Sequence, residues 1–546
     1  MRQWLADFWR SRGLSRPVAI IYVVLALLFA LAVSQFYIPG KGFTSLIAFG
    51  DQQESVRLSK VRRVDYYVER FSSGYDAQFY AQIAMDPSLK NQGLPRAVDS
   101  LPYRARRILF CATAYLFGLG DPARILQVFA LQNAVSWLLL GVLILHWFPP
   151  TGWSNLLRWS GVMFSLGVCA SVRNALMDGP SLLLIALGVF LLEKKRPWAS
   201  TAVLALSGLG KETNLLGGSI LLPETRTNWK GWGLAVLRGV LVAAPLLLWL
   251  VYITYQVGPV TDVGRRNFDL PFLAYVAKWR EVAADWAGLR MEFFAPVYGV
   301  LIMISLTVQF LFLVLRPQWT KAWWRIGVCF ALLMVFLGGA VWEGFPGAAS
   351  RVLLPMQLAF NVLVPNGRKW LAVLLAGNLT LVSAPYMLQS PPSEGYMIAG
   401  NTSLRTSETG RIVRVDFSPE WYGAEQSGAN YWCWSPGSAS VIVQNPHPVP
   451  LQARLRFSLT AKGSRAIWVR VNGAEAWRAS LSDEDTVAVS LARVSLAPGA
   501  NRIEFVTDVP PVAVQYDERL FSFSLTDFRI DLQELQPARA GIPPAR

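Results

Sequence analysis

The chain has 546 residues, of which 53% are hydrophobic, and a formal net charge of +16 at pH 7. Its mean hydropathy of +0.35 exceeds what a soluble enzyme of this length needs, so composition excludes an ordinary soluble fold. The positive charge does not indicate a nucleic-acid partner, because the densest basic groups lie in short loops between apolar runs, the positive-inside pattern of membrane proteins. These loops are residues 194–196, 226–230, 316–325 and 368–369.

Cysteine and histidine usage excludes a further class of site. The four cysteines and two histidines form no CxxC motif and no cluster along the sequence. A structural zinc site or a disulfide framework is therefore not expected.

Apolar runs of about 20 residues recur along the chain, and each is long enough to cross a bilayer as a helix. The first follows a basic N-terminus and has no small-residue cleavage site after it, so we interpret it as a retained span. About eleven spans are predicted, near residues 18–38, 124–147, 155–173, 178–193, 197–211, 213–223, 231–256, 291–316, 323–342, 350–365 and 369–389. With the N-terminus inside, an odd number of spans puts the C-terminal region outside and the basic loops inside.

The first predicted outer region covers residues 39–123 and contains an aromatic stretch at residues 73–83. At about 100° per residue, this stretch forms a helix with one apolar face. The apolar face holds Tyr75, Phe79, Tyr80, Ile83 and Ala84, and the opposite side holds Gln78 and Gln82. Asp76 falls on the apolar side, which on an interfacial helix indicates chemistry at the bilayer surface. The alternative is that Asp76 only caps the start of the helix.

A basic stretch and an apolar stretch follow in the same outer region. Residues 103–107 carry three arginines and lead into about a dozen apolar residues at 108–119. That length is short for a span, so an interfacial or re-entrant helix is expected. Arg104 and Arg107 are candidate ligands for a lipid phosphate.

Ionisable residues at the ends of the spans are functional candidates, because burying a charge is costly. The predicted topology places one such group at the outer face: Asp76, Arg173, Asp178, Lys211, Glu212, Glu343 and Arg351. Structural alternatives stay open for several of them. Lys211 and Glu212 could form a helix-end ion pair. Asp178 could be an N-cap before Gly179-Pro180, and Arg351 could extend to the membrane surface.

Beyond a linker at residues 390–392, the apolar runs shorten to strand length and alternate with polar residues. Strands are predicted at 453–459, 467–471 and 502–506, with turns at Asn472-Gly473 and Pro498–Asn501. Several short strands with turns between them predict a β-sandwich. Core packing is the expected role of most of its tryptophans, with stacking on sugar rings as the alternative. These are Trp421, Trp432, Trp434 and Trp468.

A carboxylate beside cations at one membrane face suits one reaction. The carboxylate deprotonates an acceptor hydroxyl, because a general base must lie within hydrogen-bonding reach of the nucleophile. Lysine or arginine holds the phosphate of a lipid-linked donor and stabilises the charge that develops on it.

The order of four short motifs carries a resemblance. The motifs are residues 74–80 with Asp76, Tyr115–Gly118, Met177–Pro180 and Gly210–Thr213. Over about residues 15–390 their order resembles the GT-C superfamily of membrane glycosyltransferases, which includes the aminoarabinose transferases and the protein mannosyltransferases. The resemblance implies a polyprenyl-phosphate sugar donor, an inverting transfer and Asp76 as the catalytic carboxylate. The acidic-x-acidic pair common in the first loop is absent, because Ala77-Gln78 follow Asp76. No cofactor is certain, and a divalent metal is left open.

The sequence thus predicts a polytopic α-helical membrane protein, GT-C-like over residues 1–390, with a linker and an extracytoplasmic, jelly-roll-like β-sandwich at 391–546. We expect a glycosyltransferase embedded in membrane lipid, in a bacterial inner membrane. It would move a sugar to a glycan, lipid or protein acceptor of the cell envelope at the outer face. A transporter or flippase for a lipid-linked glycan and an inactive scaffold are the other interpretations. The charges cluster at one rim rather than midway along the spans, which favours the enzyme.

Overall fold

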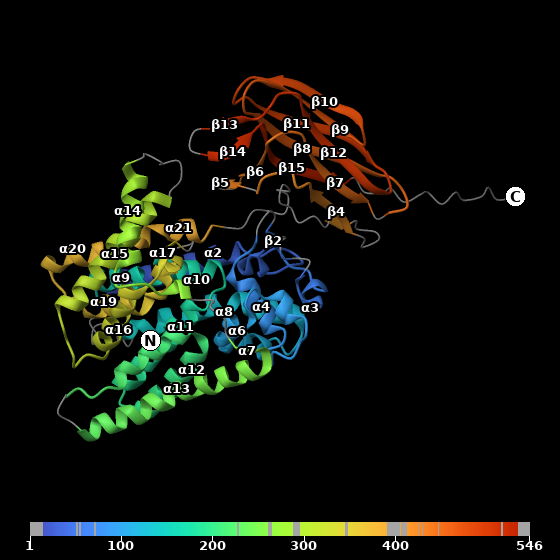
Figure 1. Cartoon of the computed structure of the whole chain (residues 1–546). Helices are drawn as coiled ribbons and strands as arrows, with labels where there is room; N and C mark the ends of the chain where they lie inside the picture. The colour runs from blue at the N-terminus through green and yellow to red at the C-terminus, as the bar shows by residue number, and fades with distance from the viewer. Residues whose placement is uncertain are drawn as a thin grey trace. The chain divides into compact units, whose positions relative to one another are not determined.

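The structure is a computed structural model that describes two compact units of the chain (Figure 1). The first unit holds residues 1–48, 56–66 and 75–390, and the second holds residues 49–55, 67–74 and 391–546. The described residues run from 15 to 532, except 51–52, 54–55, 70–72, 226–228, 260–264, 288–294, 344–347, 390–403, 406–411, 424, 428–429, 446 and 515–516. The predicted linker at 390–392 lies outside them.

The first unit is helical. Its α-helices are α2 (Arg16–Ser34), α3 (Ser59–Arg62), α4 (Asp76–Ala84), α5 (Leu94–Ala97), α6 (Leu101–Arg104), α7 (Ile108–Phe117), α8 (Pro122–Leu143), α9 (Trp153–Met163), α10 (Leu166–Arg173), α11 (Asp178–Glu193), α12 (Pro197–Gly210), α13 (Trp229–Val257), α14 (Leu273–Ala287), α15 (Ala295–Leu315), α16 (Ala322–Phe336), α17 (Gly339–Glu343), α18 (Ala348–Val352), α19 (Leu354–Leu363), α20 (Arg368–Ala376) and α21 (Ala384–Met387). The 3₁₀ helices are η1 (Thr44–Ile47), η3 (Ala105–Arg107), η4 (Ile144–His146), η5 (Glu212–Leu221), η6 (Arg265–Asn267) and η7 (Leu379–Ser383).

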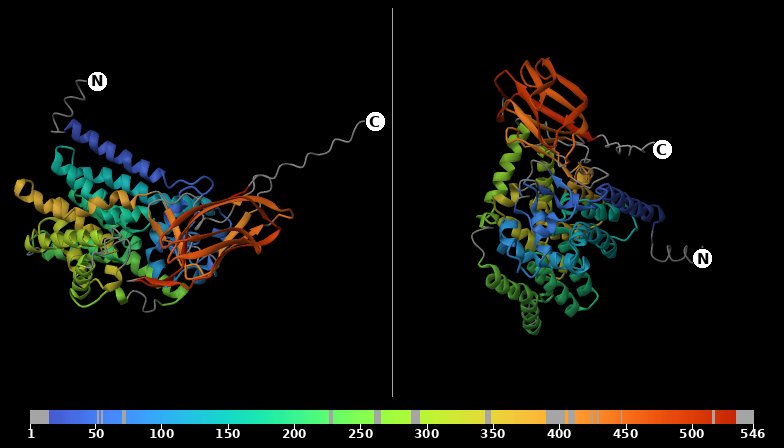
Figure 2. Two further views of the ribbon diagram at one scale, coloured as in Figure 1. Left: turned by 90° about the horizontal axis from the view of Figure 1, so that it is seen from above. Right: turned by 90° about the vertical axis from the view of Figure 1, so that its right-hand side faces the viewer.

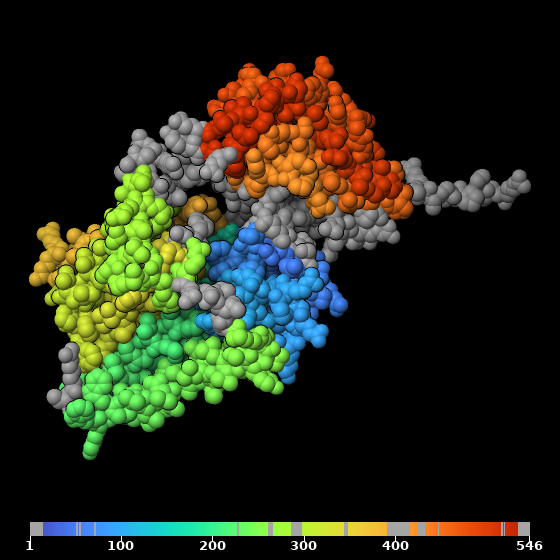
Figure 3. All heavy atoms as spheres, in the orientation of Figure 1, coloured from blue at the N-terminus to red at the C-terminus, as the bar shows by residue number. Residues whose placement is uncertain are grey.

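Several of these helices can cross a membrane. Within the described residues, α2, α8 with η4, α13 and the part Tyr298–Leu315 of α15 are long and apolar enough to do so. α20 and the helical segment after it form a pair bent by 48°, which would be a fifth span. α13, the green helix along the lower edge of Figure 3, exposes large apolar side chains such as Leu248 and Val251. Apolar surface of this kind needs lipid around it, and the chain is an integral membrane protein.

The predicted count of about eleven spans is not confirmed. Each predicted segment falls on helical residues, but many of the helices are shorter than a bilayer requires. The segment at 155–173 is two helices, α9 and α10, because a new helix starts at Ser165. The Ser165 hydroxyl accepts a hydrogen bond from the Val168 backbone N–H at 3.4 Å, as an N-cap does. Residues 213–221 lie in the 3₁₀ helix η5, which is too short to span.

Aromatic packing holds the N-terminal helix against the others. α2 lies at the edge of the helical unit in both views of Figure 2. Phe29 of α2 stacks on Trp137 of α8, with ring centroids 3.7 Å apart. The indole N–H of Trp137 donates to the Met163 carbonyl of α9 at 2.7 Å, so this buried polar group is satisfied.

The helices α11 and α12 form a hairpin that positions the site. Gly188 lets them approach closely, since a Cβ at this glycine would lie 2.9 Å from Leu204 Cδ2. The Ser200 hydroxyl donates to the Gly188 carbonyl at 2.7 Å. The start of α11 and the end of α12 therefore lie at the same end of the hairpin, which brings Asp178 beside Lys211.

The second unit is built from strands. Its strands are β1 (Phe49–Gly50), β2 (Val68–Glu69), β3 (Leu404–Arg405), β4 (Ile412–Phe417), β5 (Glu425–Ser427), β6 (Asn430–Ser435), β7 (Ala439–Asn445), β8 (Leu451–Ala461), β9 (Arg465–Val471), β10 (Ala474–Leu481), β11 (Thr486–Leu496), β12 (Gly499–Thr507), β13 (Val512–Val514), β14 (Asp517–Phe521) and β15 (Phe523–Leu532). One sheet has the order β10-β9-β12-β7-β4-β3 and another has the order β11-β8-β15-β6-β5, and both are antiparallel. β1 pairs with β2 in parallel, and β13 pairs with β14.

The sandwich and its first predicted turn are confirmed. β8 alternates buried and outward residues, and its inward side shares one core with residues of the other sheet. Asn472 and Gly473 join β9 to β10 with φ of 49° and 84°, the left-handed conformation that this two-residue turn requires. Trp421 is 5% exposed and packs against Phe505 and Phe523, so its predicted core role is correct. The jelly-roll assignment stays a prediction.

Candidate active site

A cavity of about 720 Å³ in the helical unit collects charged residues from distant parts of the sequence. They come from the start of α4, from η3, from the start of α11, from the α12–η5 junction and from α18. Four cations and three carboxylates line it, together with tyrosines and apolar side chains. The charged residues are Asp76, Arg106, Arg107, Asp178, Lys211, Glu212 and Arg351. Asp76, Lys211 and Arg351, which the predicted topology places at one membrane face, thus line one cavity.

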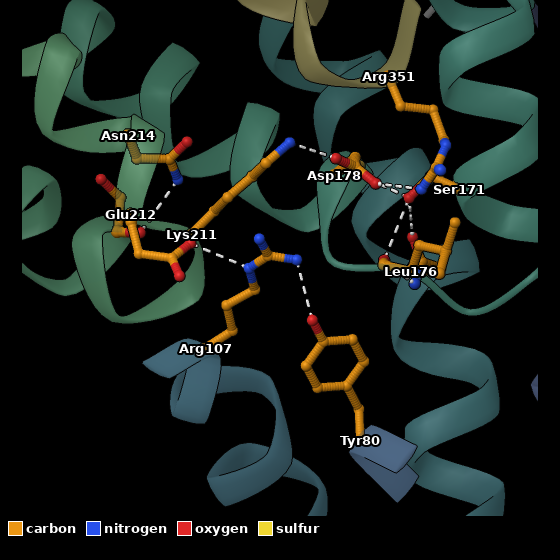
Figure 4. A network of polar contacts seen from close by, with 12 residues as sticks. Tyr80, Arg107, Ser171, Leu176, Asp178, Lys211, Glu212, Asn214 and Arg351 are labelled. Carbon is orange, nitrogen blue, oxygen red and sulfur yellow. Dashed lines mark hydrogen bonds and ion pairs between the residues drawn. The ribbon is translucent and has the colours of Figure 1, made fainter. Parts of the chain in front are cut away.

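Asp178 is the centre of the first charge cluster (Figure 4). Its side chain is 8% exposed and forms ion pairs with Lys211 and with Arg351, the latter at 3.2 Å. Lys211 reaches it because α12 ends there: the Lys211 backbone is extended, with φ −162° and ψ 130°. Arg351 also donates to the Tyr75 hydroxyl at 3.1 Å. One buried carboxylate therefore forms ion pairs with two cations.

Glu212 is the centre of a second cluster with the same charge balance. The Arg107 Nε lies 3.0 Å from a Glu212 oxygen, and an Arg106 nitrogen lies 3.9 Å from the other. Arg107 also donates to the Tyr80 hydroxyl at 2.9 Å (Figure 4). Burial raises the pKa of Glu212, but the charges of Arg107 and Arg106 and the hydrogen bonds to the carboxylate together outweigh burial and hold this pKa below its usual value. Glu212 is therefore an anion at neutral pH.

Asp76 differs from these two carboxylates because its side chain is 37% exposed. It forms an ion pair at 3.0 Å with Arg104, which also holds Asp99 through two contacts of 2.7 and 3.0 Å. Asp76 is the first residue of α4, whereas Tyr75 is the N-cap residue and its side chain accepts no capping hydrogen bond. The capping alternative for Asp76 is wrong.

The predicted interfacial character of α4 is also wrong. Residues 77–84 are all buried, including Gln78 and Gln82 on the side opposite the apolar face. Gln82 accepts from the Leu58 N–H at 2.9 Å and donates to the Ala97 carbonyl at 2.6 Å. Asp76 consequently faces a protein cavity and not the lipid surface.

The structural alternatives for the other candidates fail in the same way. Lys211 and Glu212 do not pair with each other but with different partners. Asp178 is the first helical residue of α11, and Met177 is its N-cap. Arg351 does not extend to the surface, because its side chain is 9% exposed and pairs with Asp178.

Two predicted residues that the structure describes, Arg104 and Arg173, are not part of the cavity lining. Arg104 contacts the lining residues instead, through its pair with Asp76 and its position over the rings of Tyr80 and Tyr103. Arg173 instead donates to the Ser45 carbonyl at 3.4 Å and lies over the Phe36 ring. Glu343 ends α17, and its side chain is outside the described part of the chain.

Tyr75 and Arg106 line the cavity but were not among the predicted site residues. Tyr75 contacts Arg351 although 276 positions separate them, and burial raises its pKa to about 12. Its only sequence signal is its position next to Asp76. Arg106 lies between Arg104 and Arg107, the two predicted phosphate ligands. The pattern of this basic stretch does not distinguish Arg106 from them.

The described residues contain no group of three or more His, Cys, Asp or Glu side chains arranged to hold a metal ion. The carboxylates of the cavity pair with cations instead.

Comparisons with known proteins give low similarity. No protein-family model and no curated protein matches this chain. A cryo-EM structure of the arabinosyltransferase EmbB from Mycobacterium smegmatis is similar at 12% identity and TM-score 0.36, over 94% of this chain and 64% of EmbB. The GH26-CBM35 β-(1,4)-mannanase of Podospora anserina matches at 17% identity and TM-score 0.15, over 25% of this chain and 28% of its own. The structure of TmCBM61 with β-1,4-galactotriose matches at 15% identity and TM-score 0.16, over 24% of this chain and 96% of its own. Similarities at these TM-scores do not indicate a function, so the function proposed below rests on the residues of the cavity.

Proposed function

We propose that this chain is a GT-C-type, inverting glycosyltransferase that takes its sugar from a polyprenyl-phosphate donor at the outer face of the membrane. The observation that carries the proposal is the charge balance of the cavity. The buried Asp178 cluster and the half-buried Glu212 cluster each have two cations for one carboxylate, and Asp76 lines the same cavity with its side chain partly exposed.

The two clusters suit a phosphate group. Each has a surplus positive charge, and cations aimed at phosphate oxygens make strong hydrogen bonds. Within the described part of the chain, the Nε atoms of Arg106 and Arg351 are buried without a hydrogen-bond partner. These unused donors fit an acceptor that enters the cavity, because an unsatisfied buried donor costs free energy.

Asp76 suits the role of general base. Its pair with Arg104 orients the carboxylate, and its exposure leaves an oxygen within reach of an incoming hydroxyl. In the proposed step, the acceptor oxygen forms a bond to the anomeric carbon as the bond from that carbon to the phosphate oxygen breaks. The hydroxyl proton moves to Asp76, and the electron pair of the broken bond leaves with the lipid phosphate. Lys211 and Arg351 stabilise the charge that develops there.

The test is a transfer assay with the full-length protein in lipid nanodiscs. A panel of radiolabelled undecaprenyl-phosphate pentoses and hexoses is the donor, and envelope extracts supply the acceptor. We expect Asp76→Asn to lower transfer about 10²–10⁴-fold while donor binding persists. Asp99→Asn is the matched control, because Asp99 holds the same arginine but does not line the cavity.

Unchanged transfer in Asp76→Asn would refute its role as base. Flipping of the lipid donor without any sugar transfer by the wild-type protein would refute the enzyme and support the transporter.

A further inference from the structure

A second cavity, of about 160 Å³, lies between the start of α9, the loop before α20 and α20 itself. Figure 1 shows α9, α19 and α20 gathered at the left of the helical unit. Ser154, Arg158, Arg368 and Trp370 are among its lining residues. The loop 366–369 and the residues before α9 belong to the face that the predicted topology places inside, opposite the face of the candidate active site.

Arg158 is a buried cation with only neutral partners. Arg158 is only 4% exposed. Its guanidinium donates to the carbonyls of Asn361 and Pro365 and to the Asn366 side-chain oxygen. No carboxylate of the described chain forms an ion pair with it, so its charge stays uncompensated in a place where an unpaired charge is costly.

Two more arginines flank the same cavity. Arg368, an exposed residue, lines it as the first residue of α20, where the helix dipole also favours an anion. Arg316 lies over the ring of the lining residue Trp370, with 4.6 Å between its Cζ and the ring centroid. Neither forms an ion pair with a carboxylate of the described chain. Arg158 and Arg368 thus line the cavity, and Arg316 lies against one of its lining side chains.

The position of the opening fits the membrane surface. α20 belongs to the bent pair that is apolar enough to be a span, so its start lies where a span would leave the bilayer. Leu371 and Leu374 line the cavity beside the arginines, which gives it an apolar side. Basic pockets between helices at this face of a membrane bind the head groups of anionic lipids.

We propose that this cavity binds a phosphate group at the inner face of the membrane, carried by an anionic phospholipid or present as a free anion. Arg158 supplies the fixed charge, and Arg316 and Arg368 close over the anion from the surface. The site is independent of the proposed glycosyl transfer.

The test compares the wild-type protein with Arg316→Gln/Arg368→Gln, which leaves the Arg158 hydrogen bonds intact. Binding of phosphatidylglycerol to the purified full-length protein is measured by native mass spectrometry, with phosphatidylcholine as the uncharged comparison. A second arm measures thermal unfolding in inorganic phosphate and in chloride at equal ionic strength. Arg196→Gln is the matched control, since it removes an exposed arginine from another loop of the same predicted face.

We expect the double variant to bind phosphatidylglycerol about 25-fold more weakly, about fivefold for each cation removed, and phosphatidylcholine unchanged. Loss of phosphate-specific stabilisation without a change in lipid binding would assign the site to a free anion. Equal behaviour of the wild type and the double variant in both arms would overturn the site. Arg158→Gln, with folding checked by thermal unfolding, should abolish the preference for whichever phosphate source is found.

Discussion

Replacing Asp178 by Asn tests the charge balance on which the active-site proposal rests. The substitution keeps the size of the side chain but leaves Lys211 and Arg351 buried without their shared anion. Removing one partner of a buried ion pair typically costs about 3–5 kcal/mol, because the remaining charge is uncompensated. We expect Asp178→Asn to lose stability in this range, by equilibrium unfolding of the protein in mixed micelles.

Lys211→Met provides the matched comparison. It removes one of the two cations, but Asp178 keeps its contact with Arg351 at 3.2 Å. We therefore expect a smaller loss, about 1–2 kcal/mol, from the missing charged hydrogen bond. The double variant should be less destabilised than the sum of the two single variants, because removing Asp178 makes the lysine charge unfavourable.

Additive effects, or equal losses in the two single variants, would refute the reasoning. A further measurement tests whether the charge balance of the Asp178 cluster controls the binding of phosphate. Inorganic phosphate should stabilise Asp178→Asn more than the wild type, since the variant cluster has two uncompensated cations for the anion to neutralise.

Three more outcomes follow. Tyr75→Phe removes the hydrogen bond to Arg351 and should lower transfer about 10-fold with little change in unfolding, which the transfer assay measures. The pKa of Glu212 is lower in the folded state than in the unfolded state. The ionised carboxylate therefore contributes its full stabilisation of the fold above about pH 4.3, and this contribution is lost as pH falls through the pKa of the folded state. Glu212→Gln should therefore be less stable than the wild type at pH 7, and this difference should shrink below about pH 4 in thermal unfolding; a constant difference would contradict the ion pair. Gly473→Ala should destabilise the β-unit by about 1–2 kcal/mol, because its φ is 84° and no neighbouring atom lies within 4 Å of the added Cβ, so only backbone strain acts.

Local patterns predicted much of the fold. Long apolar runs predicted α2, α8, α13 and α15, because a helix in lipid must be apolar along its whole length. Alternating apolar and polar residues and the Asn-Gly turn predicted the strands around residue 472, because both signals depend only on neighbouring residues. The span count was not confirmed, because helix breaks such as the one before Ser165 depend on short capping contacts that hydropathy does not record.

The candidate site was predicted in part. Asp76, Asp178, Lys211 and Arg351 line one cavity, as the shared membrane face of their predicted positions implied. Their partners were not predictable, because contacts such as the one from Tyr75 to Arg351 join residues that only tertiary packing brings together. The burial of α4 was missed for a related reason. Gln82 lies opposite the apolar face in sequence, but backbone groups of other segments, at Leu58 and Ala97, form hydrogen bonds with its buried side chain.

The sequence by itself determined that this protein is a helical membrane protein with a β-sheet unit at its C-terminal end, since hydropathy and alternation act over neighbouring residues. It also determined which charges stand at the ends of helices. Only the tertiary structure decided how those charges combine. Electrostatic energy depends on distances of a few ångströms between distant segments, so the sharing of Asp178 by two cations, and the isolation of Arg158 among neutral oxygens, exist only in the folded chain.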